Sequence, residues 1–265
     1  TVTSDLVEYE PAHALWSDGA DKRRWMRLPP GTQIDTTDMD HWVFPEGTQF
    51  FKEFALGGVA LETRLIERTG PGPSEVWMGT FVWRADGTDA VYEPLGRADI
   101  NGTTHDAPST ADCNRCHMGE PGRILGFSAT QLSKPGPGVT FQSLAQMGLL
   151  SASPGGVGVD YPAPGTAIEA AALGYLHANC GHCHNPTGSV AFIDMDLRLY
   201  VAERDPALTA IYRTTVGVPL ADWVSPPFTS RIVPADPAAS AILYRMEQRG
   251  NADQMPPIAS EQVDA

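Results

Sequence analysis

The sequence predicts an α+β protein in which a small antiparallel β-rich N-terminal region precedes a mainly helical C-terminal domain. Between residues 49 and 92, apolar and polar residues alternate with a period of two, the pattern of half-buried strands. Beyond residue 165, one stretch has apolar residues at helical spacing, and another begins with the Asp-Pro pair that often opens a helix. Clusters of proline and glycine separate these stretches, so we expect long loops between short elements.

The expected sheet follows an irregular N-terminal segment. The first 47 residues have no regular period, and Trp25 and Met26 are their expected buried points. Gly57-Gly58 would turn one strand into the next, and Asp86-Gly87 would close a further hairpin. In the stretch between these turns, Met78 lies on the strand face opposite the aromatic residues.

Three helices are expected after the sheet. A short one would cover Phe141 to Leu150. A longer one would begin at Thr166, whose side chain can cap the N-terminus while Glu169 reaches back, and would run to Cys180. The last would cover Pro237 to Gln248, between an Asp N-cap and a terminating glycine.

Length and composition allow two domains. A chain of 265 residues, 42% of them hydrophobic, can bury a sizeable core. The stretch from Pro154 to Gly165 is rich in glycine and proline and predicts a linker. We therefore divide the chain into a β-rich region over residues 1–153 and a helical domain over residues 154–265.

All the cysteines of the chain lie in two copies of the spacing Cys-x-x-Cys-His. The copies are Cys113, Cys116 and His117, and Cys180, Cys183 and His184. This spacing is the attachment signature of c-type haem, because the two thiols can add to the two vinyl groups of a porphyrin while the adjacent imidazole binds the iron. We predict two covalently bound haem c groups. The alternatives are a zinc site, which would need neither histidine, and a thioredoxin-like redox pair or disulfides.

The sixth ligand of each iron decides between electron transfer and chemistry on a bound small molecule. For the second haem we expect Met255, because the proline that follows holds this residue in an extended segment. For the first haem we prefer Met78, with His105 and Met147 as alternatives. Arg123 and Arg231 are candidates to pair with haem propionates. The remaining histidines, His13, His41, His177 and His182, are expected at the surface or in structural roles.

Charge and hydropathy restrict the partners. The net charge of −14 argues against nucleic acid and favours a redox partner with a basic docking face. No stretch approaches 18 consecutive apolar residues, so we expect no membrane span. The chain opens without a charged and apolar leader, so we expect any signal peptide to have been removed. Because covalent haem is attached outside the bacterial cytoplasm, we predict a periplasmic or extracellular location.

Several segments together resemble one family. They are Leu15–Gly19, Phe44–Thr48, Glu62–Arg64, Trp83–Ala90, Arg123–Phe127, Tyr175–Cys180 and Met255–Pro257. With the two Cys-x-x-Cys-His motifs, they look like the bacterial dihaem c-type cytochromes that have a β-rich N-terminal region. The resemblance implies two covalent haems and an exported protein. It also places Met78 in a stretch where methionine is usual, which supports Met78 as a ligand. One departure is that the chain ends at Ala265, where c-type cytochrome domains usually continue into a closing helix.

The sequence thus predicts a dihaem c-type cytochrome acting in electron transfer. Its β-rich N-terminal region would carry one haem cradle, and a mainly α domain resembling class I cytochrome c would carry the other. A dihaem peroxidase or oxidase with one open coordination site is the first alternative. A cytochrome subunit of a larger electron-transfer assembly is the second. We predict an electron carrier in preference to an enzyme.

Overall fold

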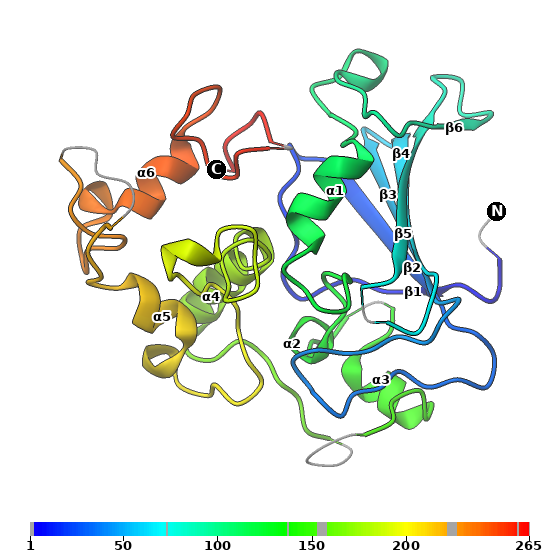
Figure 1. Ribbon diagram of the computed structural model, residues 1–265, viewed down its shortest axis with the longest axis horizontal. Coiled ribbons are helices and arrows are strands. Elements are labelled where there is room, and N and C mark those ends of the chain that lie inside the picture. The colour runs from blue at the N-terminus through cyan, green and yellow to red at the C-terminus, as the bar shows by residue number, and fades with distance from the viewer. Residues whose placement is uncertain are drawn as a thin grey trace.

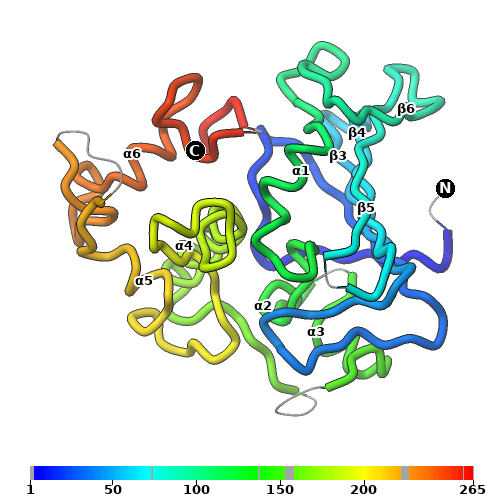
Figure 2. Tube along the Cα trace, in the orientation of Figure 1, coloured from blue at the N-terminus to red at the C-terminus, as the bar shows by residue number. Residues whose placement is uncertain are grey.

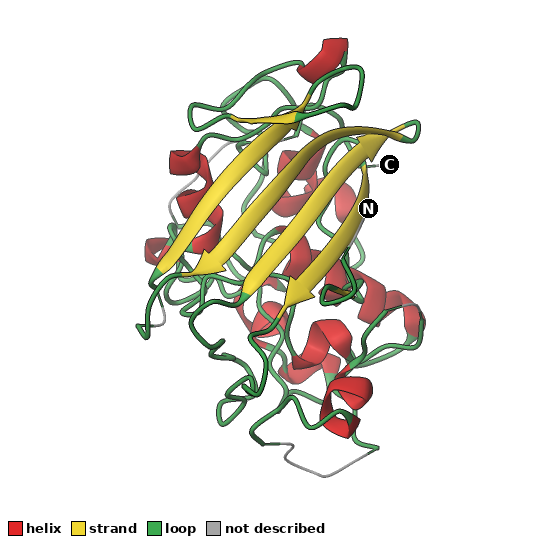
Figure 3. Cartoon of the chain, turned by 90° about the vertical axis from the view of Figure 1, so that its right-hand side faces the viewer, coloured by secondary structure: helices red, strands yellow, loops and turns green. Residues whose placement is uncertain are grey.

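Six strands form one antiparallel sheet, and the helices lie behind one of its faces (Figures 1 and 3). The computed structural model describes residues 3–72, 74–136, 138–152, 158–221, 227–258 and 260–264. The strands follow one another in chain order: β1 Val7–Glu8, β2 Asp21–Arg27, β3 Gln49–Leu56, β4 Val59–Arg68, β5 Val76–Trp83 and β6 Ala90–Tyr92. The helices are α1 Thr110–His117, α2 Ala129–Leu132, α3 Phe141–Gln146, α4 Ala167–Asn179, α5 Ala210–Thr215 and α6 Ala241–Glu247.

The expected hairpins are present. Leu56 pairs with Val59 across a two-residue turn. Gly57 and Gly58 have φ of 56° and 81°, the left-handed values that a tight hairpin turn requires and that glycine adopts without strain. The turn around Gly87 likewise leads from β5 into β6. The sequence prediction of an antiparallel sheet over residues 49–92 is confirmed.

The two faces of the sheet differ in what covers them. On the outer face the rings of Trp77 and Phe81 gather around Tyr92, with centroids 5.7 and 5.6 Å from it. On the inner face Met26 and Phe50 enter the main core, where four aromatic rings surround Phe127. The helices and loops after the sheet therefore bury one sheet face only, as expected for an antiparallel sheet with one solvated side.

The prediction of an irregular N-terminal segment was wrong. Val7–Glu8 and Asp21–Arg27 are strands, and β2 pairs along its whole length with β3. The sequence of β2, DKRRWMR, hides its period because Lys22 and Arg24 take the inner positions that apolar residues usually occupy. Trp25 and Met26 are buried, as expected.

The prediction of a mainly α, class I cytochrome c-like C-terminal domain was also wrong. In the described part of the chain after residue 158, α4 has 13 residues, α5 has 6 and α6 has 7, with long irregular segments between them. The last expected helix is split, because Pro237–Ala239 forms a 3₁₀ turn before α6 begins. Frequent prolines remove backbone donors and keep these helices short. The observed architecture is one antiparallel sheet with few helices.

Other local predictions agree better with the structure. Thr166 caps α4 and forms a capping box with Glu169, as the sequence indicates. The short helix expected from Phe141 is α3, which ends earlier, at Gln146. The predicted boundary between residues 153 and 154 and the linker residues Pro154 to Gly156 lie outside the described residues. The division into two domains therefore stays a prediction.

A segment near the N-terminus ties the C-terminal half to the sheet. Figure 2 shows this segment in blue, between α4 and the sheet. The backbone N–H of Trp16 donates to the Asn179 side chain at 2.7 Å, and Asn179 Nδ2 donates to the carbonyl of Ala14 at 3.3 Å. Asp18, which is only 6% exposed, accepts hydrogen bonds from the backbone N–H groups of Glu261 and Gln262.

Asp18→Asn should therefore loosen the C-terminal tail. The substitution keeps the shape and the tolerance for a positive φ, but replaces a charged acceptor by a neutral one. We expect the free energy of unfolding to fall by about 2 kcal/mol, the value of hydrogen bonds to a charged group. Urea unfolding measures it, with Asp21→Asn, at the exposed first position of β2, as the matched control. Equal stability of the two variants would contradict the role of Asp18.

Candidate haem-binding cavity

A cavity of about 310 Å³ lies between the inner face of the sheet, α1 and the turn that follows α4. Residues of both Cys-x-x-Cys-His motifs line it: Cys113, Cys116, His117, Cys183 and His184. Met78 and Met255 line the same cavity. The fold thus brings together Met78 and Met255, which are 177 positions apart in the chain.

Helix α1 presents the first motif. Ser109 and Asp112 form a capping box at its N-terminus, which fixes where the helix begins. Cys113 and Cys116 are three residues apart on this helix, so they lie on one face. Burial raises the pKa of the Cys113 thiol above its ordinary value. The first pair is therefore a neighbouring pair of thiols at the edge of the cavity.

His117, the last residue of α1, is held in one orientation. Its Nδ1 lies 2.6 Å from the carbonyl oxygen of Arg123, so Nδ1 carries the proton and donates to that oxygen. Burial lowers the pKa of His117 to about 4, which keeps the ring neutral. A neutral imidazole with Nδ1 protonated has its lone pair on Nε2, the arrangement of a histidine that binds a metal.

The second motif follows α4 directly. Cys180 ends that helix, and the backbone N–H groups of Cys183 and His184 donate back to its carbonyl at 3.1 and 2.9 Å. A Cβ at Gly181 would lie 2.6 Å from the carbonyl oxygen of Leu197, so this tight turn requires glycine. Asn185 closes the turn by donating to the carbonyl of Gly181 at 2.7 Å.

His184 has a buried ring nitrogen that lacks a partner among the described residues. Its Nδ1 makes no hydrogen bond, and burial lowers its pKa to about 4. A buried nitrogen without a partner is unfavourable and marks a place where a ligand or another group can complete the structure. Cys180, in contrast, lies against a second cavity of about 170 Å³, which Met255 also lines. Met255 and Pro256 line both cavities, so Met255 lies near Cys180 as well as near Cys183 and His184.

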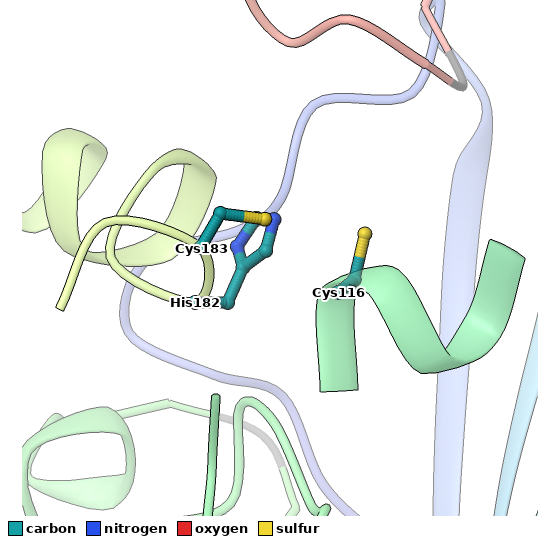
Figure 4. Close-up of side chains that lie close together, drawn as sticks. All are labelled: Cys116, His182 and Cys183. Atoms are coloured by element: carbon teal, nitrogen blue, oxygen red, sulfur yellow. The ribbon is translucent and has the colours of Figure 1, made fainter. Parts of the chain in front are cut away.

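The two motifs meet at one point. The sulfur atoms of Cys116 and Cys183 and a ring nitrogen of His182 all lie within 4.8 Å of one another. Figure 4 shows Cys116 on α1 facing Cys183 and His182 on the turn after α4. The hydrogen bond between the two thiols lowers the pKa of Cys183, an effect that His182 reinforces, and the same bond together with burial raises the pKa of Cys116.

The structure separates the candidates for the sixth ligand of the first haem. Met78 is buried and lines the cavity, whereas Met147 is 52% exposed and is not among the lining residues. His105 is also outside the lining, and its Nε2 is 2.8 Å from a carboxylate oxygen of buried Glu62. Of the three candidates, Met78 alone is placed to reach the cavity.

The other predicted residues have structural contacts. Arg231 donates to the carbonyl oxygens of Asp194 and Thr214, each at 2.8 Å, and neither it nor Arg123 lines the cavity. His41 lies 3.1 Å from Glu120, and the Nδ1 of His177 accepts from the backbone of Leu199. His182 was expected at the surface or in a structural role, but it is mostly buried beside the thiols.

Three cations that the sequence did not single out line the cavity. Arg24, Lys52 and Arg64 stand on adjacent strands of the inner sheet face. A signal was present, since the alternation of Lys22, Arg24 and Met26 has the period of a strand. The residue types obscured it, because a row of charged residues resembles a solvated loop.

The residues around the cavity fit the chemistry of c-type haem. Thiols occur in pairs at the required spacing, each followed by a neutral imidazole. Two thioethers, from Met78 and Met255, are available as second axial ligands. Apolar side chains, including those of Phe50, Ile124 and Phe127, supply the rest of a lining suited to a porphyrin.

Comparison of the chain with family models, curated proteins and solved structures found no match. Among the described residues, no helix has both the length and the apolar character needed to cross a membrane.

Proposed function

We propose that this chain is a dihaem c-type cytochrome that transfers electrons. The observation that carries the proposal is the convergence of both Cys-x-x-Cys-His motifs on one cavity that is also lined by Met78 and Met255. Two independent copies of the attachment spacing, placed on different elements, are not needed for packing. Their meeting at one site is what an electron-transfer protein with two adjacent haems requires.

Each motif residue would have a distinct role. Cys113 and Cys116 would hold the first haem and His117 would bind its iron, while Cys180, Cys183 and His184 would do the same for the second. Met78 and Met255 would complete the coordination of the two irons. Bound in this way, each haem supplies a one-electron couple, and thioether ligation favours the reduced state relative to a second imidazole.

The protein would keep the two haems close and largely dry. Because the sulfur atoms of Cys116 and Cys183 lie in one cluster, haems attached to them would come near each other at their edges. The hydrogen bond from His117 to the Arg123 carbonyl would fix the first proximal ring. The aromatic core around Phe127 would exclude water from the inner side of the cavity.

The partner and location follow from charge and from the attachment chemistry. A net charge of −14 favours docking to a redox partner with a basic face. Covalent attachment of haem favours a location in the bacterial periplasm or outside the cell. A cytochrome of this kind can work alone or as a subunit of a larger electron-transfer assembly.

The direct experiment is a haem count on the purified, exported protein. We expect a pyridine haemochrome assay to give two haems per chain, and a mass about 1.2 kDa above that of the polypeptide. Cys113→Ser with Cys116→Ser should remove one haem and leave the other. A colourless protein with the mass of the bare polypeptide would contradict the proposal.

One observation favours a different function, a zinc site. The donor atoms of Cys116, His182 and Cys183 are close enough to bind one metal ion. The two functions differ in their use of His117 and His184, which a zinc site would leave unbound. Elemental analysis that finds one zinc and no iron per chain would favour the zinc site.

Met255→Leu tests the second axial position of the second haem. Leucine keeps the volume and removes the sulfur, so we expect two attached haems but loss of the weak sulfur-to-iron band at roughly 695 nm that belongs to the second haem. Met147→Leu, at an exposed position, is the matched control and should leave the spectrum unchanged. An unaltered band in Met255→Leu would exclude this residue as a ligand.

Met78→Leu tests the first haem in the same way. We expect the oxidised first haem to become high-spin and to bind cyanide rapidly, because its sixth position would be open. Electron paramagnetic resonance and cyanide titration measure this change. If the parent protein already has a high-spin haem that binds cyanide rapidly, the dihaem peroxidase or oxidase becomes the better assignment.

A further inference from the structure

Three cations form a row across the inner face of the sheet. Arg24 on β2 is directly opposite Lys52 on β3, and Lys52 is directly opposite Arg64 on β4. Residues in direct register share a face and lie about 5 Å apart, so like charges at these positions repel. All three residues line the main cavity. A sheet that places three cations side by side against a cavity needs negative charge nearby.

The protein itself supplies only part of that charge. Arg64 forms an ion pair with Glu62, whose side chain is fully buried and also contacts His105. Arg24 is 6% exposed, and its guanidinium makes no hydrogen bond or ion pair with any residue in the described part of the chain, although its backbone carbonyl accepts from Tyr9 and the Glu10 carboxylate acts on it at longer range. Lys52 contacts the ring of Phe54, 4.7 Å from its Nζ, and has no carboxylate partner among those residues. Neither Arg24 nor Lys52 therefore has a carboxylate at ion-pair distance among the described residues, and Glu10 and Glu62 act on them only from further away.

The remaining carboxylates around the cavity are engaged elsewhere. Only Asp40 and Glu120 among the lining residues are acidic. Glu120 pairs with Arg198 at 3.0 Å and with His41 at 3.1 Å, and Asp40 accepts from the backbone of Val201. Burial, and then the nearby cations Arg24, Arg64 and Lys22, lower the pKa of Lys52 well below its ordinary value, and the opposing effect of Glu62 is too small to offset them.

The row lies at a defined place relative to the first motif. Met78 pairs with Ile66, two residues along β4 from Arg64, so the row is offset from the proposed thioether ligand by about 7 Å along the strands, with Lys52 two strands and Arg24 three strands away across the sheet, roughly 10 and 14 Å. Cys113 and Cys116 line the same cavity. A haem has two propionates side by side on the porphyrin edge away from the thioether-linked vinyl groups. Two unpaired cations match this pair of carboxylates in number and in charge.

We infer that Arg24 and Lys52, supported by Arg64, form a dicarboxylate-binding row that holds the two propionates of the first haem. This inference rests on the proposed function. The carboxylates would relieve the repulsion within the row and pair two buried charges, which removes a large unfavourable term from the loaded protein. Arg24 would bind with its planar fork and Lys52 as a point charge.

The test is the reduction potential of the first haem in Arg24→Met and in Lys52→Met. Removing a cation near the haem disfavours the reduced iron, so the ratio of reduced to oxidised first haem at a fixed potential should fall about tenfold, or about 59 mV for one electron. Arg24→Lys and Lys52→Arg keep the charge and should stay near the parent value. The potential of the second haem should stay the same in all four variants.

Arg23→Met is the matched control, because Arg23 lies on the same strand but on the outer face, where it is 56% exposed and pairs with Glu8. The inference is overturned if the Arg24 and Lys52 variants retain both haems and have the same first potential as Arg23→Met. A thermal unfolding scan of each variant confirms that the comparison is made on folded protein.

A second experiment tests whether the row of cations binds the haem propionates or a free dicarboxylate. Succinate is titrated into the oxidised parent protein, and the Soret band and the first potential are followed. If propionates fill the row, succinate has no saturable effect. A saturable effect that disappears in Arg24→Met would instead assign the row to a free dicarboxylate and overturn the inference. A chain with no covalent haem would end both the proposed function and this inference.

Discussion

The cavity depends on a small number of hydrogen bonds that hold the C-terminal half of the chain against the sheet. Asn179 at the end of α4 bonds to the segment that contains Ala14 and Trp16, and Asp18 in the same segment holds the tail at Glu261 and Gln262. Thr187 and Arg198 add direct hydrogen bonds to the carbonyl of Gly119, just after α1, at 2.6 and 2.7 Å. The N-terminal segment and these contacts together hold the two cysteine motifs side by side.

The inner face of the sheet packs in the core at one end and lines the cavity further along. At one end it contributes Met26 and Phe50 to the core, where aromatic rings pack around Phe127. Two residues further along each strand it presents Arg24, Lys52 and Arg64 to the cavity. Apolar packing keeps the strands in register, and that register determines the spacing of the cations. Core packing and the placement of the cations therefore depend on the same three strands, β2 to β4.

The turns and helix starts that neighbouring residues determine were predicted correctly from the sequence. The glycine turn at residues 57–58 and the capping box of Thr166 were correct because each depends on neighbouring residues alone. Met78 was preferred to Met147 because a ligand on the sheet would explain why a sheet precedes the first motif, and burial separates the two methionines in the same direction. Strand β2 was missed because its inner positions face a cavity and are cationic, so the usual contrast between apolar and polar faces was lost.

Contacts between residues far apart in the chain could not be predicted from these local patterns. Nothing in the spacing of the second motif indicates that Cys183 lies beside Cys116, or that Cys180 faces a separate cavity. The helical C-terminal domain was expected from one capping box and one Asp-Pro pair, but both patterns specify only where a helix starts. How far each helix runs depends on prolines and on tertiary contacts, and here those keep the helices to a few turns.

The tail contact at Asp18 also determines how the two motifs are anchored. Asp18 precedes both motifs in the chain, and Glu261 and Gln262 follow them, so their hydrogen bonds close a loop that contains every cysteine. Both motifs are thus held by the segments on either side of them, and the shape of the cavity depends on residues that do not line it.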